Sequence, residues 1–243
     1  MNINRQTTIT ERTMKPTAAK LIRWSGLAAM AAGIMFIVIQ MIHPSDVLSS
    51  VTTTQWAIVH DMSLAMDFLA LLGIAGLYAR QVKESAWLGL AGYLLFSLFW
   101  AFSAAFHFVE AFISPVLATK APKFVAGLLG MVTGAPSEMS LGAIPVVYGL
   151  TGFVGYLLGG LLFGSAMFRA GILPRWAGGL LAIGTVVTLA RVVIPHPLDR
   201  LMAVPVGLAL AWLGYALWSE RREQATEPVP ATAGTQRRQA GAE

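Results

Sequence analysis

Six long apolar runs, separated by short polar stretches, constrain this chain more than any other feature of its sequence. They lie at about 21–42, 56–79, 86–112, 141–168, 174–194 and 201–218. A helix needs roughly 20 apolar residues to cross the hydrocarbon core of a bilayer, which is about 30 Å thick. Uninterrupted runs of this length favour helices over barrel strands, which alternate apolar and polar residues. We therefore expect an all-α, polytopic membrane protein with six transmembrane helices.

The composition supports a membrane class and excludes several chemistries. Hydrophobic residues make up 56% of the 243 residues and charged residues only 12%, whereas a soluble domain carries roughly a quarter charged residues. A compact soluble fold of this size could not cover so much apolar surface. The chain has no cysteine, which excludes disulfides, thiolate metal ligands and cysteine nucleophiles.

The positions of the basic residues predict how the chain is oriented. If the N-terminus is cytoplasmic, 13 of the 17 Lys and Arg residues fall on the inner side of the six runs. The positive-inside rule therefore predicts an N-in/C-in topology. Because these basic residues flank apolar runs and no recognition fold accompanies them, we expect the lipid bilayer and not nucleic acid as a partner. The sequence leaves a homo-oligomer open.

The same pattern divides the chain into regions. Residues 1–20 are expected to form a cytoplasmic N-terminal tail, 21–218 the six-helix transmembrane domain, and 219–243 a disordered cytoplasmic tail. The longest connection, 113–140, is expected to be a loop on the outer side. Its apolar stretch is compatible with a short helix on the outer leaflet or with a plain loop.

An internal repeat is a further hypothesis. Tryptophan precedes histidine by 19 residues in the first run, from Trp24, and by 20 in the third and fifth, from Trp87 and Trp176. The even runs end on basic residues. This pattern suggests three repeated helical hairpins in one orientation. The alternative is that interfacial tryptophan and inner arginine are common to any membrane span.

The candidate site residues are polar side chains that share helix faces on the outer side. Asp67 lies about 15 Å inside the second run, where a carboxyl group must be paired, protonated or in contact with water. His60 lies on the same face, seven residues earlier. His107 and Glu110 share a face of the third run. Arg191 lies inside the fifth run, where it either pairs with Asp67 or extends its guanidinium to the interface.

The remaining histidines receive a different interpretation. His43 and His196 each precede a proline at the end of an apolar run, and we interpret them as interfacial residues. The chain has no H-E-x-x-H, G-x-S-x-G, Walker or dinucleotide motif. No reaction is therefore indicated by a motif.

Three functional hypotheses follow from these residues. The leading one is a small-molecule or lipid-binding membrane module with an outward-facing polar pocket, lined by Asp67, His60, His107, Glu110 and Arg191. The first alternative is a haem- or metal-dependent membrane redox enzyme that uses the same histidines. The second is a proton-coupled transporter with Asp67 as the proton carrier.

One segment carries a resemblance to a known family. It runs from Arg169 through Leu173-Pro174-Arg175-Trp176 to Gly184, and Leu208–Trp218 follows. Over about 165–220 the chain resembles an uncharacterised bacterial six-span integral membrane family, described as a domain of unknown function. The resemblance implies a six-helix membrane fold and a multi-pass position in a bacterial cytoplasmic (inner) membrane. It implies no active residues.

Overall fold

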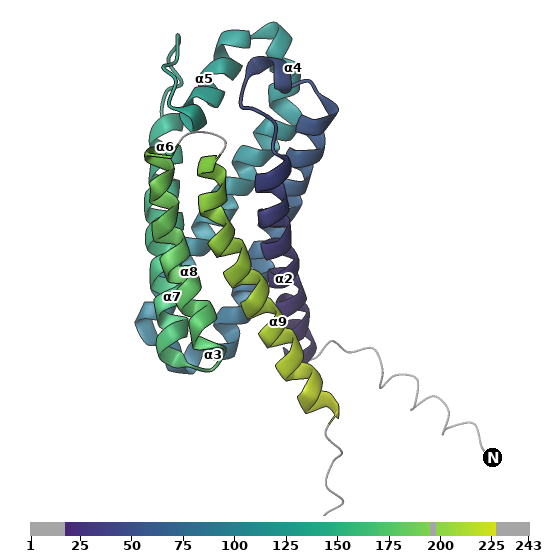
Figure 1. Ribbon diagram of the computed structural model, residues 1–243, viewed down its shortest axis with the longest axis vertical. Coiled ribbons are helices and arrows are strands. Elements are labelled where there is room, and N and C mark those ends of the chain that lie inside the picture. The colour runs from purple at the N-terminus through teal and green to yellow at the C-terminus, as the bar shows by residue number, and fades with distance from the viewer. Residues whose placement is uncertain (1–17, 195–197, 227–243) are drawn as a thin grey trace, which may run out of the picture.

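A computed structural model describes residues 18–194 and 198–226, and every regular element in these ranges is helical. The prediction of an all-α chain is therefore confirmed. His196, one of the histidines interpreted as interfacial, lies outside the described residues. So do residues 1–17 of the predicted N-terminal tail (1–20) and residues 227–243 of the predicted C-terminal tail (219–243). Figure 1 shows an elongated bundle with α2 and α9 leaving it at the same lower end.

The first half of the bundle runs from α2 to α5. Its elements are α2 (Ala18–Ile42), the 3₁₀ turn η2 (Leu48–Ser50), α3 (Thr54–Phe108), the π-helix η3 (Val109–Ile113), α4 (Ser114–Lys120) and α5 (Pro122–Thr133). Of the two structures that the sequence left open for the outer connection, the helix is the one found, because α4 and α5 occupy most of 113–140. Both begin with a proline in the first turn, where the missing N–H has no helical partner to lose.

The second half consists of two long helical passages around a shorter one. Its elements are α6 (Ile144–Leu150), the π-helix η4 (Thr151–Leu158), α7 (Gly159–Ala170), α8 (Arg175–Val187), the 3₁₀ segments η5 (Thr188–Val192) and η6 (Leu198–Ala203), and α9 (Val204–Thr226). Helix α9 continues past 218, where the sequence was expected to become disordered. The added turns are rich in Glu, Arg and Gln, which are good helix formers.

Four helices in the described ranges are long and apolar enough to cross a membrane. They are Lys20–Ile42, Thr54–Lys120, Ile144–Ala170 and Leu198–Glu220. Large apolar side chains cover the outside of the bundle: the exposed fraction is 82% for Trp87, 70% for Trp176 and 67% for Trp24. Soluble monomers rarely expose apolar surface on this scale. The structure thus supports a multi-pass membrane protein.

The 67-residue candidate span is folded back on itself. Gln81 (φ −125°, ψ 16°) and Ala86 (φ 48°, ψ −151°) interrupt the helical backbone of α3. In a straight helix the rings of Tyr78 and Tyr93 would lie about 22 Å apart along the axis, yet they stack with centroids 4.6 Å apart. Helix α3 therefore has two antiparallel arms, and Figure 1 shows their reversal at the lower end. These arms correspond to the second and third apolar runs.

Small residues bring the helices of the core into close contact. A Cβ added at Gly33 in α2 would collide with the backbone of α9 at Gly207 and Ala211, and one added at Gly73 in α3 would lie 2.6 Å from the Cα of Ala29 in α2. Such small-residue seams allow membrane helices to approach closely. They hold α2, the first arm of α3 and α9 together.

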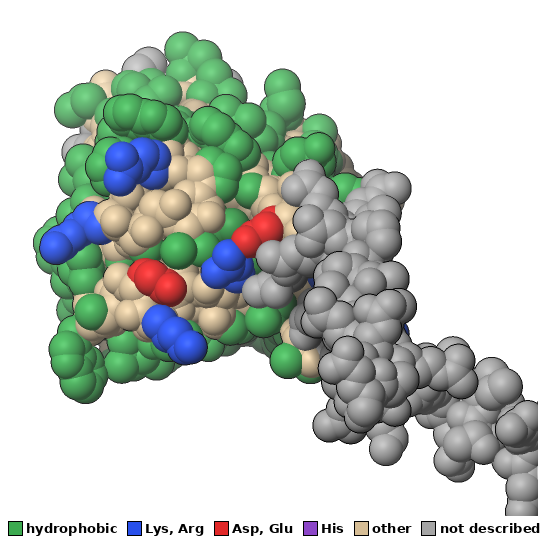
Figure 2. All heavy atoms as spheres, turned by 90° about the horizontal axis from the view of Figure 1, so that it is seen from below, with side chains coloured by type: hydrophobic (Ala, Val, Ile, Leu, Met, Phe, Trp, Pro, Cys, Tyr) green, Lys and Arg blue, Asp and Glu red, His purple; other side chains and the backbone are tan. Residues whose placement is uncertain are grey.

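The two ends of the bundle differ in chemistry. The lower end, seen from below in Figure 2, carries several Lys and Arg side chains and fewer acidic ones. There an ion pair between Arg80 and Glu220 connects the reversal of α3 to α9. At the upper end, Val125 and Leu129 of α5 pack on Val51 and Trp56 in a small apolar cluster separate from the main core. Helix α5 thus covers the start of α3.

Candidate functional site

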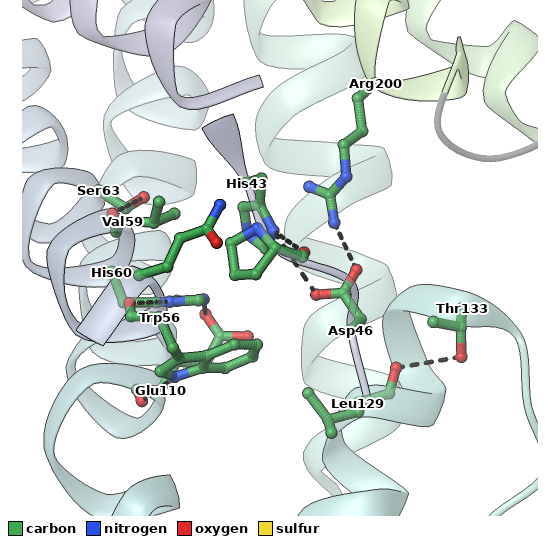
Figure 3. Close-up of polar contacts among 12 residues, drawn as sticks. His43, Asp46, Trp56, Val59, His60, Ser63, Glu110, Leu129, Thr133 and Arg200 are labelled. Carbon is green, nitrogen blue, oxygen red and sulfur yellow. Dashed lines mark hydrogen bonds and ion pairs between the residues drawn. The ribbon is translucent and has the colours of Figure 1, made fainter. Parts of the chain in front are cut away.

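A group of seven buried or half-buried ionisable side chains lies at the upper end of the bundle. We call it the histidine–carboxylate cluster and define it as His43, Asp46, His60, Asp67, His107, Glu110 and Arg200. Residues 43 and 46 follow α2, 60 and 67 lie on the first arm of α3, and 107 ends the second arm. Residue 110 lies on η3 and 200 on η6. Figure 3 shows part of this group.

His60 is held by Trp56, one turn earlier in α3. The two rings stack with centroids 3.9 Å apart, and Nδ1 of His60 donates to the carbonyl oxygen of Trp56 at 2.8 Å. A carbonyl can only accept, so Nδ1 must carry the proton. The other nitrogen, Nε2, lies 3.7 Å from Oε2 of Glu110. The side chain of His60 is therefore fixed, with Nε2 directed toward a carboxyl group.

Glu110 is positioned by a local departure from α-helical geometry. It lies on the five-residue π-helix η3, and its carbonyl oxygen accepts a hydrogen bond of 2.8 Å from Nε1 of Trp56. Single π-turns inside longer helices occur frequently at functional sites. The same tryptophan thus binds the main chain of Glu110 and orients the imidazole that faces its side chain.

Asp67 is paired with His107 at the deepest part of the cluster. Oδ2 of Asp67 lies 2.6 Å from Nδ1 of His107, and the aspartate side chain is fully buried. Its second oxygen, Oδ1, has no hydrogen-bond partner among the described residues. The hydroxyl of Ser103 approaches the same Nδ1 at 3.5 Å. In a Ser-His-Asp triad the serine and the aspartate use different ring nitrogens, so these three residues do not form one.

Asp46 and Arg200 form a second buried pair, close to His43. Nη2 of Arg200 lies 2.5 Å from Oδ2 of Asp46, and the side chains are only 8% and 6% exposed. Nδ1 of His43 binds the carbonyl oxygen of Pro44 at 2.7 Å and lies 3.9 Å from Oδ1 of Asp46. Figure 3 shows Arg200 extending down toward Asp46 from above, with His43 to the left of Arg200.

The imidazole rings connect these pairs into one group. Ring centroids are 5.1 Å apart between His43 and His60 and 6.3 Å apart between His60 and His107. These separations exceed direct hydrogen bonding but a single water can bridge such gaps. The series extends from the end of α2 to Asp67, which is fully buried.

The charges of the cluster do not balance. It contains three carboxyl groups and one guanidinium. If all three carboxyl groups are ionised and the imidazoles are neutral, the cluster carries two negative charges in excess. Excess charge in a site with little water is costly unless protons or a cation neutralise it. The cluster is therefore suited to taking up protons or a positively charged group.

The structure brings together four of the five residues predicted to line the pocket. These are Asp67, His60, His107 and Glu110. The fifth, Arg191, pairs instead with Asp199, with Nη2 to Oδ2 at 3.3 Å. Of the two roles left open for Arg191, the bridge to Asp67 is not formed, because Asp67 binds His107.

Sequence reasoning missed His43, Asp46 and Arg200. The first was interpreted as interfacial because a proline follows it, and the last was counted only as a basic residue of the outer side. Two signals could have identified them. The first is the spacing of His43 and Asp46, which lie three residues apart at the end of an apolar run. The second is the pair of neighbouring charges Asp199 and Arg200, which precedes another apolar run. Both signals place ionisable groups at a membrane boundary, where they need partners.

The metal hypothesis has no support from the geometry. The described residues contain no group of three or more His, Asp or Glu side chains that could hold a metal ion.

Comparison of the chain with family models, with curated proteins and with solved structures finds no match. The function must therefore be argued from the cluster itself.

Proposed function

We propose that this protein is a multi-pass membrane module that binds a small, positively charged ligand at the histidine–carboxylate cluster from the outer side. Primary amines are the favoured class, because an ammonium group has three donors and no acceptor and so matches carboxylate oxygens and unprotonated imidazole nitrogens. A free amine and an amine-bearing lipid headgroup present the same group to the site.

The excess of carboxyl groups is the observation that carries this proposal. The only guanidinium of the cluster, that of Arg200, is already paired with Asp46. Among the described residues, the ion-pair partners of Glu110 and Asp67 are imidazoles, those of His60 and His107. A ligand ammonium near Glu110 would supply the missing positive charge, and its transfer from water would be offset by charge-assisted hydrogen bonds.

Access supports entry beside Glu110. Its side chain is 24% exposed and that of His107 is 23% exposed, whereas His60 and Asp67 are almost fully buried. A ligand can therefore reach the outer members of the cluster, while the inner ones hold them in place.

Six crossings with both termini in the cytoplasm are part of the proposal. The arms of α3 supply two antiparallel passages, and α8 with η5 supplies an apolar passage over Arg175–Val192 between two longer ones. Figure 1 places the first described residues of α2 and the end of α9 at one end of the bundle. The resemblance to a bacterial six-span family favours a bacterial inner membrane. The threefold hairpin repeat stays a prediction.

Thermal unfolding of the detergent-purified protein tests the amine site. We expect ethanolamine and putrescine to raise the melting temperature and glycerol to leave it unchanged; at 100 times Kd the stabilisation is about 2.7 kcal/mol. Glu110→Gln should remove the response, because it removes one of the two carboxyl groups of the cluster that have no guanidinium partner. Glu138→Gln is the matched control, since that side chain is 73% exposed in the outer connection. Equal shifts with Glu110→Gln and wild type would refute the proposal.

Proton-coupled transport is the second candidate, favoured by the depth of Asp67. Its unpartnered Oδ1 and the series of three imidazoles form a path by which protons from the outer side could reach a fully buried carboxyl. Protonatable side chains inside membranes are typical of proton pathways. In liposomes with a pH-sensitive dye inside, amine uptake should acidify or alkalinise the lumen with wild type and not with Asp67→Asn. Amine binding without any proton movement would be consistent with the binding module and would reject the proton-coupled transporter.

A further inference from the structure

The surface between α7 and α8 carries a second feature that the histidine–carboxylate cluster does not use. A groove of about 410 Å³ lies there, lined by Leu161, Ser165, Phe168, Arg169, Gly179 and Ile183 among others. This volume falls within the range of small-ligand sites. Figure 1 shows α7 and α8 side by side, and apart from Ser165 and Arg169 the lining is apolar.

The groove is slightly shorter than the hydrocarbon part of one bilayer leaflet. Its lining extends from Leu161 to Arg169 along α7, which is about 12 Å. Half of the hydrocarbon core is about 15 Å thick. Close packing sets its floor, because a Cβ added at Gly164 would lie 2.5 Å from the backbone nitrogen of Ala182. The two helices touch through small residues while larger ones form the walls.

Positive charge gathers at one end of the groove. Arg169 lines it, and the guanidinium of Arg175 lies 5.3 Å from the ring of Phe168, which also lines it. In the part of the chain that the structure describes, Arg169 forms no ion pair with a carboxylate. The ring of Trp176 packs edge-on against Phe168 at 5.4 Å and is 70% exposed. Exposed tryptophan is typical of the membrane–water interface.

We propose that this groove binds an anionic phospholipid, with one acyl chain along α7 and α8 and the phosphate beside Arg169 and Arg175. The apolar walls match a hydrocarbon chain, and the two guanidinium groups match a headgroup with excess negative charge. The proposal is independent of the amine site, because the groove ends at the lower, basic end of the bundle and the cluster lies at the upper end.

Native mass spectrometry of the full-length protein, titrated with phosphatidylglycerol or phosphatidylcholine, tests the proposal. We expect tighter retention of phosphatidylglycerol by wild type. Arg169→Gln should weaken it roughly fivefold, the effect of one basic residue on an anionic headgroup. Lys83→Gln is the matched control, because Lys83 lies at the exposed reversal of α3. Equal retention of the two lipids, or an equal loss in both variants, overturns the proposal.

A steric variant tests the acyl-chain part separately. Val186 lines the groove and is 41% exposed, so Val186→Trp can fill the groove without repacking the core. We expect it to lower the retention of both lipids. Val146→Trp, at a 62% exposed position on α6, should not. If Val186→Trp instead dissociates a dimer and leaves lipid retention unchanged, the groove is a contact between two copies and the proposal is wrong.

Discussion

Asp67 and Arg200 show how single residues create the candidate site. Each is an ionisable group that the bundle buries, and each is paired with a residue far away in sequence: Asp67 with His107, and Arg200 with Asp46. Removing one partner of a buried pair leaves the other charge uncompensated. These residues are therefore coupled, and the coupling can be measured.

The first prediction concerns the Asp67–His107 pair. Asp67→Ala should lower the free energy of unfolding by about 3 kcal/mol, because it leaves an imidazole without its carboxyl partner. The double variant Asp67→Ala/His107→Ala should lose at least about 1 kcal/mol less than the sum of the single variants. Chemical denaturation in mixed micelles measures all three. Additive losses would show that the 2.6 Å contact does not exist in solution.

At this scale the sequence indicated four residues that the structure brings together, Asp67, His60, His107 and Glu110, but it did not indicate Arg200 or show how these residues pair. A carboxyl about 15 Å inside an apolar run must find a partner, and Asp67 does. The sequence analysis named Arg191 as the possible partner, and the structure has His107 instead. Helical spacing determines which residues share a face within one helix but not the rotation of one helix against another. Helix–helix contacts at glycines set that rotation, and they are tertiary features.

At the scale of elements, the reversal of α3 is the least regular part of the bundle. Ala86 adopts φ 48° and ψ −151°, and it is the only non-glycine residue of the described ranges with a positive φ. Such a conformation costs a residue with a Cβ of order 1–3 kcal/mol. The antiparallel arms, and with them the approach of His107 to Asp67, depend on this turn.

Ala86→Gly is therefore expected to stabilise the protein by about 1 kcal/mol. Glycine removes the strain at φ 48°, and the gain is reduced by its larger entropy in the unfolded chain. Ala91→Gly, at an exposed helical position of the second arm, is the matched control and should lose about 0.5–1 kcal/mol. Melting temperatures in one detergent compare the two. A loss in both variants would contradict the positive φ.

The seam between α2 and α9 leads to a third prediction. Gly33→Ala should cost about 1–3 kcal/mol, because its Cβ would collide with the α9 backbone and force the helices apart. A Cβ at Gly152 in η4 meets nothing within 4 Å, so Gly152→Ala should be neutral or stabilising. The same melting experiment measures both, and equal effects would show that the seam is not closely packed.

At the scale of the whole molecule, the positions of the apolar runs were sufficient to predict most of the architecture. All six runs appear as helical segments, since length and hydropathy determine which residues can lie in lipid. Two features were harder to predict from the sequence. The helical structure of the connection at 113–140 depends on the packing of α5 over Trp56. The reversal within α3 depends on the backbone dihedral angles of Gln81 and Ala86. The number of membrane crossings, and the side of the membrane on which each end of the bundle lies, stay predictions.

Cysteine labelling tests that topology without a background, because the natural chain has no cysteine. In intact cells a membrane-impermeant maleimide should label Glu138→Cys in the outer connection and should not label Glu84→Cys at the reversal of α3. In permeabilised cells both cysteine variants should be labelled. Both glutamates are exposed, so accessibility within the protein is matched. Labelling of Glu84→Cys in intact cells would refute six N-in/C-in crossings.

The pairing of Asp46 with Arg200 has a consequence for biogenesis. The chain is made from its N-terminus, so the acid near the end of the first helix emerges long before the arginine that precedes the last one. Until that final segment joins the bundle, the aspartate lacks the guanidinium that it binds in the folded chain, and the histidine–carboxylate cluster lacks Arg200. A nascent or truncated chain that stops before η6 therefore carries the aspartate without its counterion, and the pair can form only when the last helix packs against the first.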